Sequence, residues 1–290
     1  MQRFVVREAA RFVVGMLGAI LVASAIAAVG EPYARTLPGF GSAFADHLWH
    51  LVRLDLGTSA VSGLPALQEL AQYLPATLLL VLMGFAVALA TGVPLGLLFA
   101  LGAARRIAAP LVQVITATPV FCAGLALAFG AVHLLHWPVS VNAPVGAAVA
   151  PDQLLQITAL PVLTVGLAGA AAVQLVLRRA TLRSSGEAFR TGLKRLGLGS
   201  LEIEFLYVVP RVFAGLLIGA GEIMVALLSA TVVAEWVFHR TGAADLFVKS
   251  VALADWDLAA ILLFVFAGMT FTANFLGNLL GHALAPREAP

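Results

Sequence analysis

Residues 178–211 read RRATLRSSGEAFRTGLKRLGLGSLEIEFLYVVPR and lie between two long apolar runs. The stretch holds seven of the 17 Arg and Lys residues of the chain, so its solvent must be water rather than lipid. The seven are Arg178, Arg179, Arg183, Arg190, Lys194, Arg195 and Arg211. The positive-inside rule places such a stretch on the cytoplasmic side of a membrane.

A short amphipathic helix is predicted inside this stretch. Ser184 and Glu187 have the separation of a capping box at its start. The apolar side chains that follow recur at helical spacing, with basic residues between them: Phe189, Leu193 and Leu196. Gly197 and Gly199 then end the helix. The pattern alone leaves open whether this helix simply lies on the bilayer surface.

The composition of the whole chain is that of a membrane protein. Hydrophobic residues make up 61% and charged residues 11%, and the mean hydropathy of +1.00 is far outside the range of soluble globular domains. We therefore predict an all-α polytopic membrane protein that contacts lipid. The net charge of +2 is no signature of nucleic-acid binding, because the basic residues cluster where membrane topology places them. The single cysteine, Cys122, cannot form an intrachain disulfide.

Six apolar runs are long enough to cross about 30 Å of hydrocarbon as helices. They are residues 12–30, 75–101, 107–132, 153–177, 212–238 and 258–285. The last five runs, within residues 75–285, form the core of one transmembrane domain. The connecting segments are a cytoplasmic N-terminus (1–11), a periplasmic region (31–74), a periplasmic loop (133–152), the cytoplasmic stretch 178–211, a second periplasmic loop (239–257) and a cytoplasmic tail (286–290). A signal peptide is the alternative interpretation of the first run, because Ala23-Ser24-Ala25 has the form of a cleavage site.

The distribution of basic residues agrees with this topology. Thirteen of them fall on the cytoplasmic side: the seven named above with Arg3, Arg7, Arg11, Arg105, Arg106 and Arg287. Four fall outside: Arg35, Arg53, Arg240 and Lys249. The bias is strongly positive-inside, and six spans put both termini on the same side. Two pairs of glycines with small-xxx-small spacing, Gly215 with Gly219 and Gly277 with Gly281, predict close contacts between helices.

The spacing within residues 191–210 resembles the EAA loop of ABC-importer permeases. Gly197 lies thirteen positions before Pro210, as in that signature, although Thr191 and Gly192 replace its Glu-Ala. Thr191, Gly197 and Leu198 match the form that is usual in the dipeptide, oligopeptide and nickel subgroup. The resemblance implies that residues 188–200 are a coupling helix that docks into a groove of an ATPase subunit. The implied coupling residues are Phe189, Arg190, Thr191, Gly192, Leu193, Lys194, Arg195, Leu196, Gly197 and Pro210.

Segments elsewhere extend the resemblance over nearly the whole chain. They are residues 54–59, 74–77, 118–121, 232–238 with Gly242, and 255–257. Leu54, the triplet 239–241 and Asn278 depart from the residues that are usual in the family. The chain thus resembles an inner-membrane permease subunit of a dipeptide/oligopeptide/nickel-type ABC importer. The resemblance implies the type I importer fold, with six transmembrane helices in the bacterial inner membrane.

The predicted function follows from this resemblance and from a missing motif. The chain has no Gly-rich loop followed by Lys-Ser or Lys-Thr, so it cannot hydrolyse ATP by the P-loop mechanism, and we predict that it is not an enzyme. The resemblance implies a second homologous permease subunit, two ATP-binding subunits that hold ATP and Mg²⁺, and a periplasmic solute-binding protein. No cofactor is predicted on this chain itself. Peptide is the first choice of substrate, and nickel complexes, glutathione and opine-like solutes remain open.

Three polar residues of the fifth predicted span are candidates for the translocation pathway. Glu222 lies ten residues beyond Val212, which at about 1.5 Å per residue puts it roughly 15 Å deep in the bilayer. A carboxylate at that depth is expected to face the pore or a polar partner. Ser229 and Glu235 follow on the same span.

Two other classes of membrane protein predict different features. A secondary transporter or channel that works without an ATPase predicts matched halves with broken helices or several intramembrane charges, and a membrane-embedded enzyme is a more distant possibility.

His47 and His50 are three residues apart in the periplasmic region, but two histidines without a third ligand do not predict a metal site.

Overall fold

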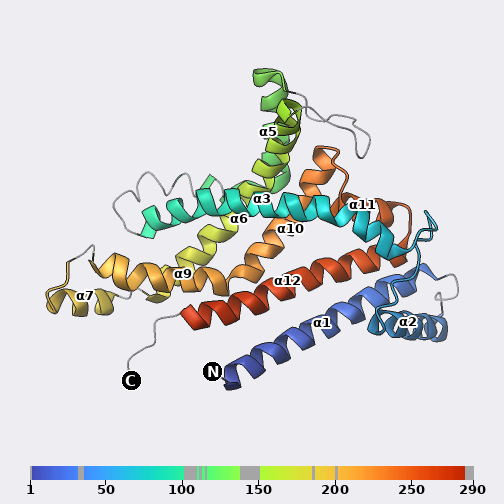
Figure 1. Ribbon diagram of the computed structural model, residues 1–290, viewed down its shortest axis with the longest axis horizontal. Coiled ribbons are helices and arrows are strands. Elements are labelled where there is room, and N and C mark those ends of the chain that lie inside the picture. The colour runs from blue at the N-terminus through green and yellow to red at the C-terminus, as the bar shows by residue number, and fades with distance from the viewer. Residues whose placement is uncertain are drawn as a thin grey trace.

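The computed structural model describes residues 2–31, 36–100, 110, 113–114, 116–137, 151–184, 187–199 and 202–284 (Figure 1). Over these residues the chain is helical, and its β-pairing is limited to an isolated bridge between Thr58 and Pro65. The elements are α1 (Gln2–Gly30), α2 (Leu37–Val52), α3 (Ala66–Ala100), α5 (Val120–Leu135), α6 (Pro151–Ser184), α7 (Glu187–Arg195), the π-helix η2 (Ile203–Val208), α9 (Val209–Ile218), α10 (Ala220–Val237), α11 (Ala243–Ala252) and α12 (Trp256–Leu284). The prediction of an all-α fold is confirmed.

Five of these helices are long and apolar enough to cross a membrane: α1, α3, α6, α10 and α12. Two shorter apolar helical segments accompany them, α5 and residues 206–218. The predicted third span, 107–132, overlaps α5, which begins directly after Pro119; residues 107–109, 111–112 and 115 of that span lie outside the described residues. The polytopic character of the fold is therefore confirmed.

Several helices extend beyond the apolar runs that predict them. Helix α3 begins at Ala66, ahead of Pro75, and α6 continues to Ser184 past the basic pair Arg178 and Arg179. Hydropathy detects where lipid solvation ends, whereas Arg and other long polar residues are good helix formers that let a helix continue into water. The fifth run behaves differently, because Gly219 divides it into α9 and α10.

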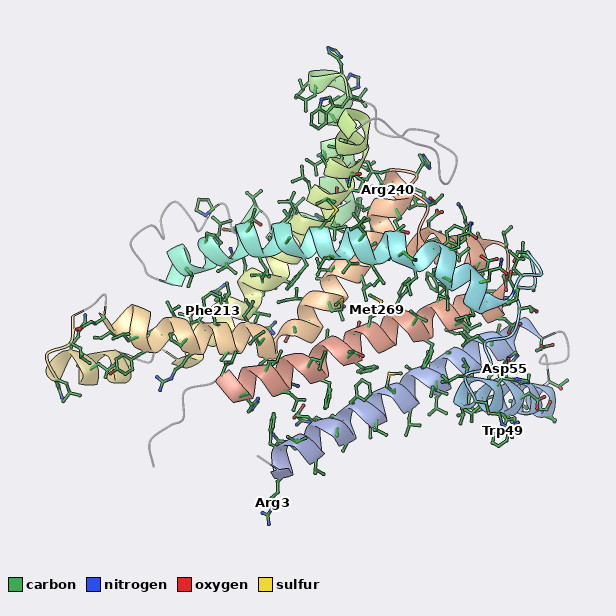
Figure 2. All side chains as sticks on the ribbon, in the orientation of Figure 1. Arg3, Trp49, Asp55, Phe213, Arg240 and Met269 are labelled. Carbon is green, nitrogen blue, oxygen red and sulfur yellow. The ribbon has the colours of Figure 1, made fainter. Side chains whose placement is uncertain are left out.

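The helix ends lie toward two ends of the molecule. In Figure 1 the start of α1, the end of α12 and α7 lie toward one end, and α2 and α11 lie toward the other. Figure 2 shows Arg3 at the first of these ends and Trp49 and Asp55 at the second. The basic residues of α1 and α7 thus lie toward the same end of the molecule.

Glycines allow the central helices to approach closely. In the contact between α3 and α6, a Cβ on Gly92 would lie 2.8 Å from Val173 Cγ1, and a Cβ on Gly96 would lie 2.6 Å from Leu177 Cδ1. Gln174 donates a 2.8 Å hydrogen bond from Nε2 to the carbonyl of Gly92, beside the intrahelical Pro94. Close packing of this kind drives helix association in lipid, where the hydrophobic effect gives little preference for contact between helices.

The glycine pairs at four-residue spacing form the close contacts predicted for them. Gly277 and Gly281 of α12 face the backbone of α9, where a Cβ on Gly281 would lie 2.7 Å from the carbonyl oxygen of Ala214. Gly215 and Gly219 face Ala180 and Val176 of α6. Helices α6 and α9, which come before and after α7 in the chain, are therefore packed directly against each other, and α9 also packs against α12.

The first and last helices are joined by a buried carboxylate. Glu8 of α1 is buried against α12, where Asn278 Nδ2 donates a 2.8 Å hydrogen bond to its Oε2. Arg11 donates from its guanidinium to Glu8 Oε1 at 2.6 Å. A charged group is buried without large cost only when it is paired and hydrogen-bonded in this way.

Candidate functional site

Helix α7 is a short helix at one end of the molecule, set apart from the bundle (Figure 1). Its C-terminus has the hydrogen bonds of a Schellman motif: Gly197 N donates to Lys194 O at 3.0 Å, and Leu198 N donates to Leu193 O at 3.3 Å. Gly197 has φ +86°, a left-handed conformation that glycine adopts without a steric penalty. This explains why the helix ends where the sequence predicts.

The coupling residues implied by the sequence do not all share one environment. Leu193 is partly buried and packs back against the core of the chain together with Leu198, whereas Leu196 is 79% exposed. Polar and glycine positions of the same helix are exposed: Thr191, Gly192, Lys194, Arg195 and Gly197. The side chains of Phe189 and Arg190 lie outside the described residues. Leu196 is therefore the apolar side chain that α7 presents to solvent among those the structure describes.

The chain returns from α7 through the π-helix η2, which leads into α9. Pro210 occupies the first turn of α9, where its missing N–H leaves no intrahelical hydrogen bond unmade. Single π-turns are frequent at functional sites, because their wider winding interrupts the regular helix ladder. The connection between α7 and Pro210 thus has irregular backbone at Gly197, just after α7, and at η2, just before Pro210.

The three candidate pathway residues of α10 separate into two environments. Glu222 and Ser229 are exposed, and with Val225 and Trp236 they recur along one face of the helix. Glu222 Oε2 accepts a 2.6 Å hydrogen bond from the guanidinium of Arg179 on α6, so a polar partner satisfies it. Glu235 is 1% exposed and does not share this face.

Glu235 instead binds the start of α11. Its Oε1 accepts a 2.7 Å hydrogen bond from Thr77 Oγ1 of α3, and its Oε2 accepts a 2.8 Å hydrogen bond from the backbone N–H of Asp245. The same Thr77 oxygen accepts from the N–H of Ala243 at 2.7 Å. Two of the N–H groups left unpaired at a helix N-terminus are satisfied in this way. A Cβ on Gly242 would overlap the Glu235 carboxylate, so this position must remain glycine.

A second buried carboxylate lies just after α11. Asp255 is 1% exposed, and Ser59 donates a 2.5 Å hydrogen bond to its Oδ2. Its Oδ1 accepts from the N–H of Leu258 at 3.3 Å, in the first turn of α12. Glu235 and Asp255 thus bind hydroxyls from motif segments of the first third of the chain. The motifs of these segments do not reveal the pairing, although a buried carboxylate in an apolar chain signals that a polar partner exists.

The two histidines of α2 lie beside different carboxylates. His47 lies 3.6 Å from Glu31 and 3.5 Å from Asp257, and His50 Nδ1 lies 2.8 Å from Asp55 Oδ2. The hydrogen bond from His50, followed by that from the N–H of Gly57, lowers the pKa of the Asp55 carboxyl. Throughout the described ranges no three His, Cys, Asp or Glu side chains stand close enough to hold a metal ion.

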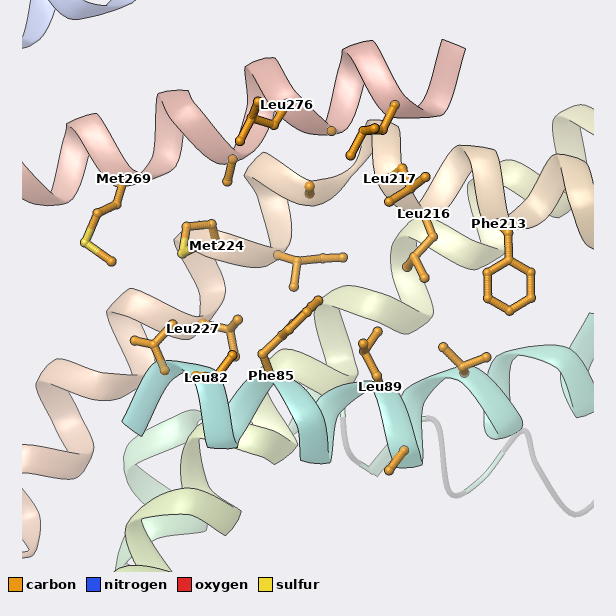
Figure 3. Close-up of a pocket in the computed structure, with 18 of the residues that line it drawn as sticks. Leu82, Phe85, Leu89, Phe213, Leu216, Leu217, Met224, Leu227, Met269 and Leu276 are labelled. Carbon is orange, nitrogen blue, oxygen red and sulfur yellow. The ribbon is translucent and has the colours of Figure 1, made fainter. Parts of the chain in front are cut away.

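An apolar cavity of about 1040 Å³ lies between α3, α9, α10 and α12 (Figure 3). Leu82, Phe85 and Leu89 extend into it from α3, and Met269 and Leu276 extend from α12. All of its lining side chains are apolar. Helix α10 therefore has an apolar face toward this cavity and a different, partly polar face that carries Glu222 and Ser229.

Known proteins are similar to this chain over most of its length. A family model described as binding-protein-dependent transport system inner membrane component matches residues 92–289. The oligopeptide transport system permease protein OppB of Mycobacterium tuberculosis is 27% identical over 272 residues, covering 84% of this chain and 79% of OppB, and the Mycobacterium bovis protein gives the same values. A probable peptide ABC transporter permease protein, y4tP, of Sinorhizobium fredii is 24% identical over 241 residues, covering 82% and 76% of the two chains.

The matched residues include α6, α7, the return through η2 and Pro210, and the helices α9 to α12. The family match covers more than half of the chain, and the apolar helices are those of a protein that crosses the membrane several times. The chain belongs to the binding-protein-dependent transport system inner membrane components, and it is a multi-pass inner-membrane permease of an ABC importer.

Proposed function

We propose that this permease forms half of the translocation pathway of a peptide importer and is coupled to ATPase subunits through α7. The similarity to OppB and y4tP, which are named as oligopeptide and peptide permeases, supports peptide as the substrate. The partners are a second homologous permease subunit, two ATP-binding subunits that hold ATP and Mg²⁺, and a periplasmic solute-binding protein. Membership of this family favours that arrangement over a transporter or channel that works alone.

The observation that carries the coupling proposal is the surface of α7. An exposed Leu196 lies beside Lys194 and Arg195 on a helix that projects from the bundle at its basic end (Figure 1). An exposed apolar anchor surrounded by charged groups is the usual form of a protein-binding helix. The left-handed Gly197 holds this helix in place, since it sets the direction in which the chain leaves α7.

Replacement of Gly197 by aspartate is expected to uncouple the importer. The space around Gly197 is open, so the strain comes from the backbone: a left-handed conformation costs most residues roughly 1–2 kcal/mol, and aspartate less than most because its short polar side chain can hydrogen-bond locally. Aspartate also places a negative charge beside the basic surface of α7. We expect the protein to insert normally, while retention of ATPase subunits, ATP hydrolysis stimulated by the binding protein, or solute uptake falls about tenfold in reconstituted complexes.

Two control variants separate the causes of that effect. Gly197→Asn adds a neutral side chain of the same shape as aspartate, and both residues enter the left-handed region more easily than most, so its defect should be smaller by the effect of the negative charge alone. Gly192→Ala lies in the same helix, with open space and no left-handed backbone, and should behave as the wild-type protein. Wild-type docking, hydrolysis and uptake by Gly197→Asp would show that α7 is only a surface helix.

We further propose that the exposed face of α10 lines the route taken by the solute. After Cys122 is replaced by alanine, a cysteine at Ser229 should react with a water-soluble maleimide in the assembled importer, and substrate should slow the reaction. A cysteine at the buried Leu227 of the same helix is the control and should remain unlabelled. Equal rates at the two positions, or no reaction at Ser229→Cys, would exclude this face from the route.

A further inference from the structure

The helices before and after α7, which we call its two arms, are in close contact. We call this contact, between residues 176–180 of α6 and residues 215–219, the junction. Helix α6 leads into α7, and α9 and α10 lead away from it. A Cβ on Gly219 would lie 2.5 Å from Val176 Cγ1, and a Cβ on Gly215 would overlap the Cβ of Ala180. The arms therefore run side by side in opposite directions, with Ala180 opposite Gly215 and Val176 opposite Gly219.

A break in the helix lies within this junction. Helix α9 ends at Ile218 and α10 begins at Ala220, and Gly219 between them has φ −82° and ψ 6°. Any residue can adopt these angles, so glycine is required here by the close approach of α6 and not by the backbone conformation. Apolar packing joins α10 to α6 two turns further on, where a Cβ on Gly169 would lie 2.7 Å from Leu227 Cδ2, so the break lets the first turns of α10 bend relative to α9 unless a contact there joins them to the junction.

The ion pair between Arg179 and Glu222 provides such a contact. The guanidinium of Arg179 lies 2.6 Å from the carboxylate of Glu222. In the pairing of the two arms, Arg179 stands near Gly215, on the α9 side of the break, whereas Glu222 lies beyond it in the first turn of α10. The Arg179 side chain thus reaches along the junction, past Gly219, to the start of α10.

The exposure of Arg179 and Glu222 favours a role in positioning α10 over a role in stabilising the folded protein. The two side chains are 53% and 56% exposed, and ion pairs this exposed contribute little to folding. The helix dipole adds to the attraction at Glu222, because a carboxylate is favoured in the first turn of a helix and Glu222 lies in the first turn of α10.

We propose that Arg179 and Glu222 are positioning residues that join α10 to α6 across the break at Gly219. With the pair intact, a displacement of α7 moves α6, α9 and α10 together, and the exposed face of α10 follows the ATPase. Without the pair, α7 still docks, but its movement is absorbed by bending at Gly219. This inference rests on the proposed coupling function of α7.

The test compares single variants with the exchanged pair. Glu222→Gln and Arg179→Gln should retain the ATPase subunits and binding-protein-stimulated hydrolysis, while solute uptake per ATP falls about threefold, in keeping with the modest strength of an exposed pair. The exchange Arg179→Glu with Glu222→Arg should recover at least half of the wild-type ratio. The matched control is Lys249→Gln, which removes a 2.6 Å ion pair with Asp245 whose lysine is 61% exposed, and it should leave the ratio unchanged.

Several outcomes would overturn the proposal. An unchanged ratio in the single variants, or no recovery in the exchanged pair when the protein inserts normally, would exclude positioning by the ion pair. Release of the ATPase subunits would place the defect in docking instead. A defect of Glu222→Gln confined to charged peptides would show that Glu222 senses the charge of the solute. If Gly197→Asp has no effect while Arg179→Glu with Glu222→Arg restores uptake, the coupling role proposed for α7 is wrong, but the positioning role of the ion pair is supported.

Discussion

Replacing Gly277 by alanine is expected to destabilise the folded protein by about 3 kcal/mol, the upper range for overpacking. Its added Cβ would overlap the carbonyl oxygen of Leu217 and lie 2.7 Å from Ala220 Cβ. A backbone atom cannot rotate away as a side chain can, so α12 would have to separate from α9 and α10. Because a whole domain is stable by only about 5–15 kcal/mol, such a loss lowers both the thermal midpoint and the yield of monodisperse protein in detergent.

Gly268→Ala is the matched control for this prediction. Gly268 lies on the same helix, where a Cβ would meet only Met16 Cε at 3.8 Å, an ordinary van der Waals contact. Alanine should therefore be neutral there, or stabilise the helix by up to about 1 kcal/mol through its higher helix propensity. Similar thermal midpoints for the two variants would contradict the close contact between α12 and α9.

The second large effect is expected from Glu235→Ala. The change leaves the hydroxyl of Thr77 and the N–H of Asp245 buried without their acceptor, at a cost of about 1–3 kcal/mol for each unsatisfied group. Residues 243–252 lose part of their N-terminal capping, so hydrogen exchange should accelerate first in α11. The thermal midpoint in detergent reports the total loss.

Three further variants test the network around Glu235. Glu235→Gln keeps an oxygen acceptor and should be less damaging than alanine. Thr77→Val added to Glu235→Ala should cost less than the sum of the two single changes, because both remove the same interaction. Ser229→Ala, on the exposed face of α10, should leave the midpoint unchanged. Strict additivity would show that Thr77 and Glu235 act independently.

Features set by local sequence were predictable. Hydropathy identifies most of the membrane helices, and Gly197 marks the end of α7 because only a residue that accepts φ +86° suits that position. The positions at which a helix breaks within an apolar run could not be predicted from the sequence. Residues 212–238 read as one uninterrupted span, and the division at Gly219 coincides with its contact with Val176, a residue of another helix.

The partners of buried and interfacial charges also escaped sequence analysis. The sequence shows Glu222 and Glu235 in the same apolar run, and both were assigned to the pathway. Their partners, Arg179 and Thr77, lie 43 and 158 residues away in the chain. Hydropathy measures how costly a charge is in lipid, but only the packing of helices decides which hydroxyl or guanidinium meets it.

The long-range hydrogen bonds of Glu235 and Asp255 impose an order on biosynthesis. Ser59 and Asp255 are 196 residues apart, so α3 and the loop before it enter the membrane long before their acceptors are translated. Until then Thr77 lacks both of its final partners, and its hydroxyl can bond only a carbonyl of its own helix, as Thr91 bonds Val87. Synthesis at about 5–20 residues per second makes this interval of the order of ten seconds. During that time the nascent permease lacks the hydrogen bonds that join α3 to α10 and α11.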